Sequence, residues 1–141
     1  MKRTASASWS GGLKDGKGKL STHSGALDNL PYDFADRFES GPGTNPEELI
    51  GAAHAGCFTM FLAGKLAEAG MKAEQLQTTA TVSLDKVDGG FSITAVHLDL
   101  TARVTGGDRA AFENAVKLSK EGCPVSKVLN AAITVDMRLE S

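Results

Sequence analysis

The feature that most constrains the fold is a long apolar helix in the middle of the chain. A glycine- and proline-rich turn at residues 41–43 precedes Asn45, which can cap a helix, and Pro46, which suits the first helical position. Two glutamates follow, where acidic side chains complement the positive end of the helix dipole. The pattern predicts a helix from Pro46 to about Ala69, ended by Gly70.

The middle of this helix, residues 50–66, carries apolar side chains in nearly every direction. A helix that is apolar on all sides is normally buried, so we expect it to be the central element of the fold. Gly56 is unusual there, because a glycine inside a helix costs about 1 kcal/mol relative to alanine. Its presence indicates that another backbone, or a substrate, approaches the helix closely.

The segments on either side of this helix indicate an α+β protein. Residues 24–40 are irregular, whereas alternating apolar and polar residues with glycine turns predict strands elsewhere. Those strands are expected over residues 5–9, 19–22, 79–87, 91–105 and 133–139. A second helix is expected over 109–121, and a short helical piece after Pro124. We therefore predict a single domain, residues 1–141, in which an antiparallel sheet covers a buried helix.

Charge and composition exclude several classes of partner. The net charge of −2 lacks the basic excess typical of nucleic-acid-binding proteins. No secretory signal is evident, and no stretch reaches the roughly 18 apolar residues of a membrane span. The three histidines show no paired ligand spacing, so no metal site is expected. We expect a soluble cytoplasmic protein that binds neither nucleic acid nor membrane.

The two cysteines are the first candidates for chemistry, since a cysteine pair in a reducing compartment is either core filler or redox-active. Cys57 lies within the apolar helix, where a cysteine is commonly a small hydrophobic residue. Cys123 falls at the start of the short helical piece, where free backbone amides favour a thiolate. The two residues are 66 positions apart, so only the fold can bring them together.

Three charged or titratable residues are weaker candidates. Arg37 lies between aromatic residues and is either a surface arginine or part of a site, and Glu47 either complements the helix dipole or belongs to a site. His54 precedes Cys57 by one helical step and could act as a base. Because a lone histidine on a helix is more often packed or exposed, we leave His54 out of the site. A cysteine hydrolase using Cys57 and His54 remains an alternative, as does a non-catalytic dimer that binds small hydrophobic ligands.

Two motifs resemble those of the OsmC/Ohr family. Residues 43–58, GTNPEELIGAAHAGCF, resemble the family signature, and residues 122–129, GCPVSKVL, resemble its second cysteine motif. Residues 31–38 and 83–87 favour the osmotically inducible, OsmC branch over the organic-hydroperoxide-resistance branch. The resemblance spans nearly the whole chain. Gly56 departs from it, because alanine or serine is expected there, and this bears on the shape of the pocket.

The resemblance implies a peroxidase that acts on organic hydroperoxides and more weakly on hydrogen peroxide. It implies that Cys57 is the peroxidatic thiol, Cys123 the resolving thiol, Arg37 the activating cation and Glu47 its orienting partner. It also implies an intertwined α+β homodimer with active sites at the subunit interface. No prosthetic cofactor is expected, and the resemblance suggests that the reductant is an external dithiol of the lipoyl type.

The chemistry of such a site is consistent with these residue types. An apolar pocket raises the pKa of a thiol, and an adjacent guanidinium reverses this effect, so that Cys57 can attack as a thiolate. The resulting sulfenic acid condenses with a second thiol to form a disulfide. Ten residues of helix separate Glu47 from Cys57, about 15 Å at 1.5 Å per residue. We therefore predict that Glu47 reaches the active site of the partner subunit.

Overall fold

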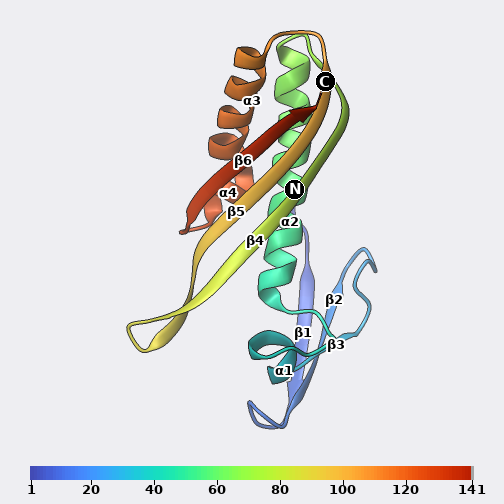
Figure 1. Cartoon of the computed structure of the whole chain (residues 1–141). Helices are drawn as coiled ribbons and strands as arrows, with labels where there is room; N and C mark the ends of the chain where they lie inside the picture. The colour runs from blue at the N-terminus through green and yellow to red at the C-terminus, as the bar shows by residue number, and fades with distance from the viewer. Residues whose placement is uncertain (141) are drawn as a thin grey trace. The chain divides into compact units, whose positions relative to one another are not determined.

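A computed structural model describes residues 1–140, and within this range the chain forms four helices and six strands (Figure 1). They fall into two compact units, residues 1–49 and residues 50 onward. The strands form two three-stranded sheets, one in each unit. The predicted α+β class is confirmed, and the prediction of one domain over residues 1–141 stays a prediction.

The first unit is built on a small antiparallel sheet in the order β1-β2-β3. Its strands are β1 (Ala5–Ser10), β2 (Lys17–Thr22) and β3 (Leu30–Tyr32). The helix α1 (Phe34–Phe38) follows. The structure thus adds β3 and α1 to a stretch whose irregular pattern predicted neither, because both elements are too short to show a periodicity.

The loop after α1 is organised around Asp36. Asp33 caps α1 by accepting from the Asp36 backbone N at 3.0 Å, and the Asp36 carboxylate accepts from the Asp33 N at 3.1 Å. The same carboxylate accepts from the Gly43 N at 2.7 Å, and Asn45 Nδ2 donates to the Asp36 carbonyl at 3.1 Å. A Cβ atom on Gly41 would clash with backbone atoms of Ala35 and Asp36, so this position requires glycine, whereas a Cβ on Gly43 would clash only with the Asp36 carboxylate.

The long helix α2 (Pro46–Glu68) begins and ends close to where the sequence predicts. Asn45 Oδ1 accepts from the Glu48 N at 2.8 Å as the expected cap, and Gly70 has the positive φ of +75° typical of a helix stop. By length and composition α2 is also apolar enough to cross a membrane. This is weak evidence, because the core helix of a soluble protein passes the same test.

Only one face of α2 is buried, which corrects the expectation of a helix covered on all sides. Phe58, Leu62 and Leu66 are fully buried against the core. The opposite face is apolar and exposed, with Met60 at 81% exposure. The small residues of this exposed face include Ala52, Ala53, Gly56, Ala63, Gly64 and Ala67. One chain therefore covers only part of the apolar surface of α2.

The second unit contains a mixed sheet in the order β4-β5-β6. The strands β4 (Lys72–Val87) and β5 (Gly90–Thr105) form a long antiparallel hairpin, as predicted. The strand β6 (Ala132–Glu140) pairs parallel to β5, with Leu98 opposite Val135, so the prediction of purely antiparallel sheets is wrong for this strand. Two helices lie between β5 and β6, and a connection of this length lets the chain return in the same direction.

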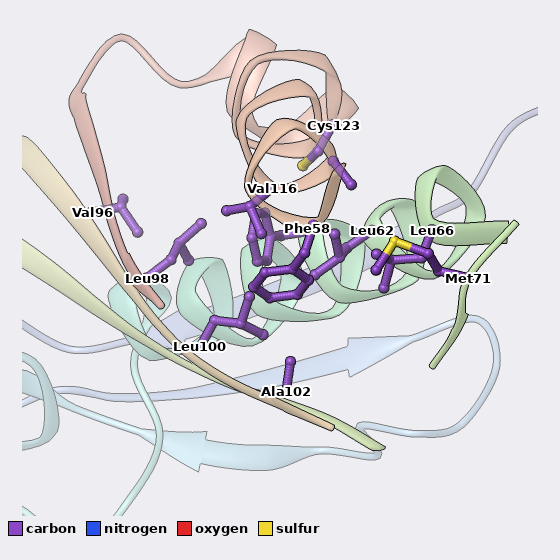
Figure 2. Packing of buried hydrophobic residues seen from close by; sticks show 12 residues of the cluster. Phe58, Leu62, Leu66, Met71, Val96, Leu98, Leu100, Ala102, Val116 and Cys123 are labelled. Carbon is purple, nitrogen blue, oxygen red and sulfur yellow. The ribbon is translucent and has the colours of Figure 1, made fainter. Parts of the chain in front are cut away.

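The core of the second unit lies between this sheet and two helices, α2 and α3 (Arg109–Gly122), on one of its faces (Figure 1). Alternate residues of β5 point into it, and Figure 2 shows Val96, Leu98 and Leu100 directed towards Phe58 and the other apolar side chains of the helices. The short helix α4 (Pro124–Val128) follows α3. Cys123, which joins α3 to α4, is fully buried at the edge of this core (Figure 2).

Candidate active site

The two cysteine side chains, 66 residues apart in sequence, face each other within hydrogen-bonding reach. Cys57 comes from the middle of α2 and is partly buried, whereas Cys123 is the N-cap of α4 and is fully buried. Both thiols are free; Cys123 belongs to the buried apolar cluster around Phe58, and Cys57 packs against that cluster. The fold therefore places two reduced sulfurs together in apolar surroundings.

The surroundings of Cys57 oppose its ionisation within one chain. Burial raises the pKa of the Cys57 thiol, and the hydrogen bond to Cys123 raises it further. A hydrogen bond from the backbone of Val125 acts in the opposite direction and is outweighed. No cation within residues 1–140 offsets these effects on the pKa of Cys57.

Cys123 lies in a more favourable position for a thiolate. Burial raises the pKa of Cys123, but hydrogen bonds from Cys57 and from Ser126 outweigh it, so that the pKa is lowered overall. The Ser126 backbone N donates to Cys123 Sγ at 3.4 Å and the Ser126 hydroxyl donates at 3.5 Å. The prediction that Cys123 caps the short helix is confirmed.

Arg37 and Glu47 form an ion pair in the first unit. Arg37 Nη2 donates to Glu47 Oε1 at 2.8 Å, and Arg37 Nε donates to Oε1 at 3.1 Å and to Oε2 at 3.3 Å. This fork orients the guanidinium more firmly than a single contact would. Glu47 is buried, while the Arg37 side chain is 40% exposed. Within residues 1–140, Arg37 Nη1 donates no hydrogen bond and can therefore donate to a ligand.

An apolar pocket of about 310 Å³ adjoins the guanidinium. Aromatic side chains supply most of its wall, and the pocket is lined by Trp9, Leu13, Tyr32, Phe34, Arg37 and Phe38, together with Asp33. Such a pocket combines an apolar wall with one cationic donor. It suits a small molecule that has a hydrocarbon part and an oxygen-bearing end.

The four predicted site residues are therefore found in two pairs, Arg37 with Glu47 and Cys57 with Cys123. Among residues 1–140 no group of three or more histidine, cysteine or acidic side chains is arranged to hold a metal ion.

His54 and Ser126 are polar residues beside the cysteines that were not predicted as part of the site. His54 is fully buried, and its Nε2 lies 2.8 Å from Ser126 Oγ. No hydrogen bond joins His54 to Cys57 in the described part of the chain. One feature of the sequence could have pointed to them, because each of the two residues lies three positions from a cysteine. Only the fold, however, brings His54 and Ser126 together.

Several known proteins resemble this chain in sequence or in structure. The family model described as "OsmC-like protein" matches residues 39–138. Peroxiredoxin OsmC of Escherichia coli is 53% identical over 135 residues, which cover 96% of this chain and 94% of that protein. The organic hydroperoxide resistance protein of Xanthomonas axonopodis pv. citri is 30% identical over 70% of this chain and 68% of its own length. The crystal structure of the organic hydroperoxide resistance protein OhrB of Bacillus subtilis superposes with a TM-score of 0.70 at 27% identity, covering 96% of this chain and 98% of that one.

Proposed function

Because this chain belongs to the OsmC/Ohr family, on its OsmC branch, we propose that it is a thiol-dependent peroxidase that reduces organic hydroperoxides to alcohols. The observation that carries the proposal is the meeting of the Cys57 and Cys123 thiols in apolar surroundings. Two free thiols within reach of each other, one partly buried and one fully buried, form the arrangement that a two-cysteine redox cycle needs.

In the proposed cycle, Cys57 is the peroxidatic thiol. Its thiolate attacks a peroxide oxygen, the O–O bond breaks, and the departing alkoxide takes up a proton to leave as the alcohol. Cys57 is then a sulfenic acid, which condenses with the Cys123 thiol to give a disulfide and water. An external dithiol, of the lipoyl type or similar, reduces the disulfide by two electrons and is itself oxidised to a disulfide.

The cation that ionises Cys57 is Arg37, oriented by Glu47, and we place both in the site of the partner subunit. Ten residues of helix, about 15 Å, separate Glu47 from Cys57 in sequence. The raised pKa of Cys57 within one chain also requires a cation from elsewhere. The exposed apolar face of α2 supports a homodimer, since an apolar helix face of this kind marks an interaction site.

The apolar pocket beside Arg37 accounts for the choice of substrate. Aromatic side chains can contact the hydrocarbon part of an organic hydroperoxide, while Arg37 Nη1 donates to its oxygens. Hydrogen peroxide lacks the hydrocarbon part and would be reduced more slowly. We further propose that residues 1–141 act as one cytoplasmic domain without a prosthetic group.

The decisive experiment is the consumption of cumene hydroperoxide in the presence of a dithiol such as dihydrolipoamide. We expect turnover by the wild type and none above background by the Cys57→Ser variant, with hydrogen peroxide consumed more slowly. Circular dichroism provides the control that the variant is folded. Equal turnover by the wild type and Cys57→Ser would refute the proposal.

The hydrolase alternative finds no support in the contacts of His54. A hydrolase of this kind needs a histidine that accepts the thiol proton, yet His54 bonds to Ser126 instead.

A further inference from the structure

A buried chain of polar groups connects α2 with the resolving cysteine. It starts at His54, which is fully buried, and continues through Ser126, which is 8% exposed. His54 Nε2 lies 2.8 Å from Ser126 Oγ, and Ser126 Oγ in turn donates to Cys123 Sγ at 3.5 Å. His54 and Ser126 are 72 residues apart, so this connection exists only in the folded protein.

The number of protons available determines which atom donates in each hydrogen bond of this chain. The Ser126 hydroxyl has one proton, and if that proton is donated to Cys123, then His54 Nε2 must carry a proton and donate it to Ser126 Oγ. His54 Nδ1 is then an unprotonated acceptor. This nitrogen is buried and has no hydrogen-bond partner among the described residues.

The opposite assignment is less favourable. If Ser126 donated to Nε2, the neutral imidazole would carry its proton on Nδ1, as a buried N–H donor without a partner. Unpaired buried N–H groups are rarer in proteins than under-satisfied acceptors. The chain of donors therefore runs from His54 through Ser126 to Cys123.

We propose that His54 is a positioning residue for the resolving step: by donating to Ser126 it holds the serine hydroxyl as a donor to Cys123 Sγ and so favours the attack of that sulfur on Cys57. His54 touches no reacting atom and acts only through Ser126. This inference rests on the proposed peroxidase function, because it assigns a role within the same redox cycle.

The step that benefits is the formation of the disulfide. The Cys123 thiolate attacks the sulfur of the Cys57 sulfenic acid, so that an S–S bond forms and the S–O bond breaks. The departing hydroxide combines with the proton that Cys123 released on ionisation, and the product is water. A sulfur that is already anionic attacks faster than a thiol, because the thiolate is the nucleophile.

The groups that face Cys123 Sγ agree with this role. They are the Cys57 thiol, the Ser126 hydroxyl, and the backbone N–H groups of Ser126 and Val125, all of which lower the pKa of Cys123. The serine hydroxyl is the one that a second side chain, His54, orients.

The first test titrates Cys123 alone. The chain has two cysteines, so in a Cys57→Ser background the ultraviolet absorbance of the thiolate reports Cys123 without a labelling reagent. We expect Ser126→Ala and His54→Leu to raise the pKa of Cys123 by about one unit, a tenfold loss of thiolate below that pKa. His54→Gln and Ser126→Thr keep the donors and should restore most of the thiolate.

The second test follows the redox cycle with Cys57 present. After one equivalent of cumene hydroperoxide, His54→Leu should form the Cys57 sulfenic acid, trapped with dimedone, at the wild-type rate. The loss of free thiols to the disulfide should be about tenfold slower. Thermal unfolding identifies variants that are not folded. If His54→Leu is not folded, Ser126→Ala replaces it in this experiment.

The outcomes separate this proposal from the proposed function. An unchanged Cys123 titration in folded His54→Leu and Ser126→Ala overturns the role of His54, whether or not the wild type consumes peroxide. An equal defect in His54→Gln and His54→Leu overturns it too, because the defect would not depend on the donor. Absence of peroxide consumption by the wild type would refute the peroxidase function and leave the titration as the test of the His54–Ser126–Cys123 chain.

Discussion

At the scale of single residues, the two cysteines differ in what surrounds them rather than in their own chemistry. Hydrogen bonds from Cys57 and Ser126 lower the pKa of Cys123 despite burial, whereas burial and Cys123 raise the pKa of Cys57. The residue proposed to attack the peroxide is thus the one that a single chain leaves protonated. Its reactivity depends on a cation, which we assign to Arg37 of the partner subunit.

A Cys123→Ser variant should lose activity within a few turnovers. Without a resolving thiol, the Cys57 sulfenic acid persists and a second peroxide oxidises it to the sulfinic acid, which dithiols do not reduce. Intact-protein mass spectrometry should show two added oxygen atoms on Cys123→Ser and none on the dithiol-treated wild type. Sustained turnover by Cys123→Ser would contradict the assignment of Cys123 as the resolving residue.

His54 should make the folded state sensitive to acid. Burial lowers the pKa of His54, so below its ordinary pKa of 6.5 the unfolded chain binds a proton that the folded chain does not. The free energy of unfolding should therefore fall as the pH drops from 6.5 towards the folded pKa, by at most about 1.4 kcal/mol per pH unit.

Urea unfolding measures this effect when the wild type is compared with His54→Gln, which does not titrate. Between about pH 7.5 and about pH 5.5, a range that brackets the ordinary histidine pKa, the wild type should lose more stability than the variant. A stability difference that stays constant with pH would show that His54 does not titrate differently on folding.

At the scale of elements, the loop between α1 and α2 determines where Arg37 lies. The Asp36 carboxylate accepts from the backbone N of Asp33, before α1, and from that of Gly43, within the loop, and Arg37 is the next residue in the chain. The loop thereby orients Arg37 towards Glu47 in the first turn of α2.

Gly43→Ala should therefore reduce peroxidase activity without unfolding the protein. The added Cβ would lie 2.4 Å from the Asp36 carboxylate, which must shift and move Arg37 with it. A misplacement of about 1 Å can cost up to about a hundredfold in rate, and we expect a fall in kcat/KM of about tenfold or more. Gly90→Ala is the matched control, because a Cβ there meets nothing within 4 Å. Equal activity of the two variants would argue against the role of this loop.

At the scale of the whole molecule, the exposed apolar face of α2 is the feature that one chain leaves unexplained. Met60 is 81% exposed, and a Cβ on Gly56 or Gly64 would meet nothing within 4 Å. Neither glycine is needed for packing within the chain, yet each lowers helix stability by about 1 kcal/mol relative to alanine. A second copy of the chain lying against this face would account for the exposed Met60 and for the two glycines.

Gly56→Trp should convert the proposed dimer into a monomer. The chain itself leaves room at this position, so the fold should tolerate the large side chain while a partner helix could not approach. Size-exclusion chromatography with light scattering should give the mass of one chain for Gly56→Trp. Lys117→Trp, at an exposed position of α3, should keep the wild-type mass. A Gly56→Trp dimer would place the interface elsewhere.

Mixed dimers test whether each site combines two subunits. Arg37→Ala and Cys57→Ser should each be inactive as homodimers. Co-expressed with different tags and purified as the mixed dimer, they should recover about half of the wild-type activity, because one of the two sites then holds both Cys57 and the partner's Arg37. An inactive mixed dimer would mean that Arg37 serves the Cys57 of its own chain.

Much of the architecture was predicted because it depends on neighbours in the sequence. The start of α2 at Pro46, its stop at Gly70, the β4–β5 hairpin and the cap at Cys123 follow from local spacing, turn residues and side-chain capping. These signals act over a few residues, so a linear pattern is enough to find them. The site residues Arg37, Glu47, Cys57 and Cys123 were named from motifs of the same local kind.

The tertiary structure decided everything that joins distant segments. The parallel pairing of β6 with β5, the meeting of Cys57 with Cys123, and the bond from His54 to Ser126 each link residues tens of positions apart. No local periodicity encodes such contacts, because they arise when apolar faces of separate elements are buried together. The sequence alone therefore named the residues to which we assign the chemistry, and the packing of the core determined which of them meet.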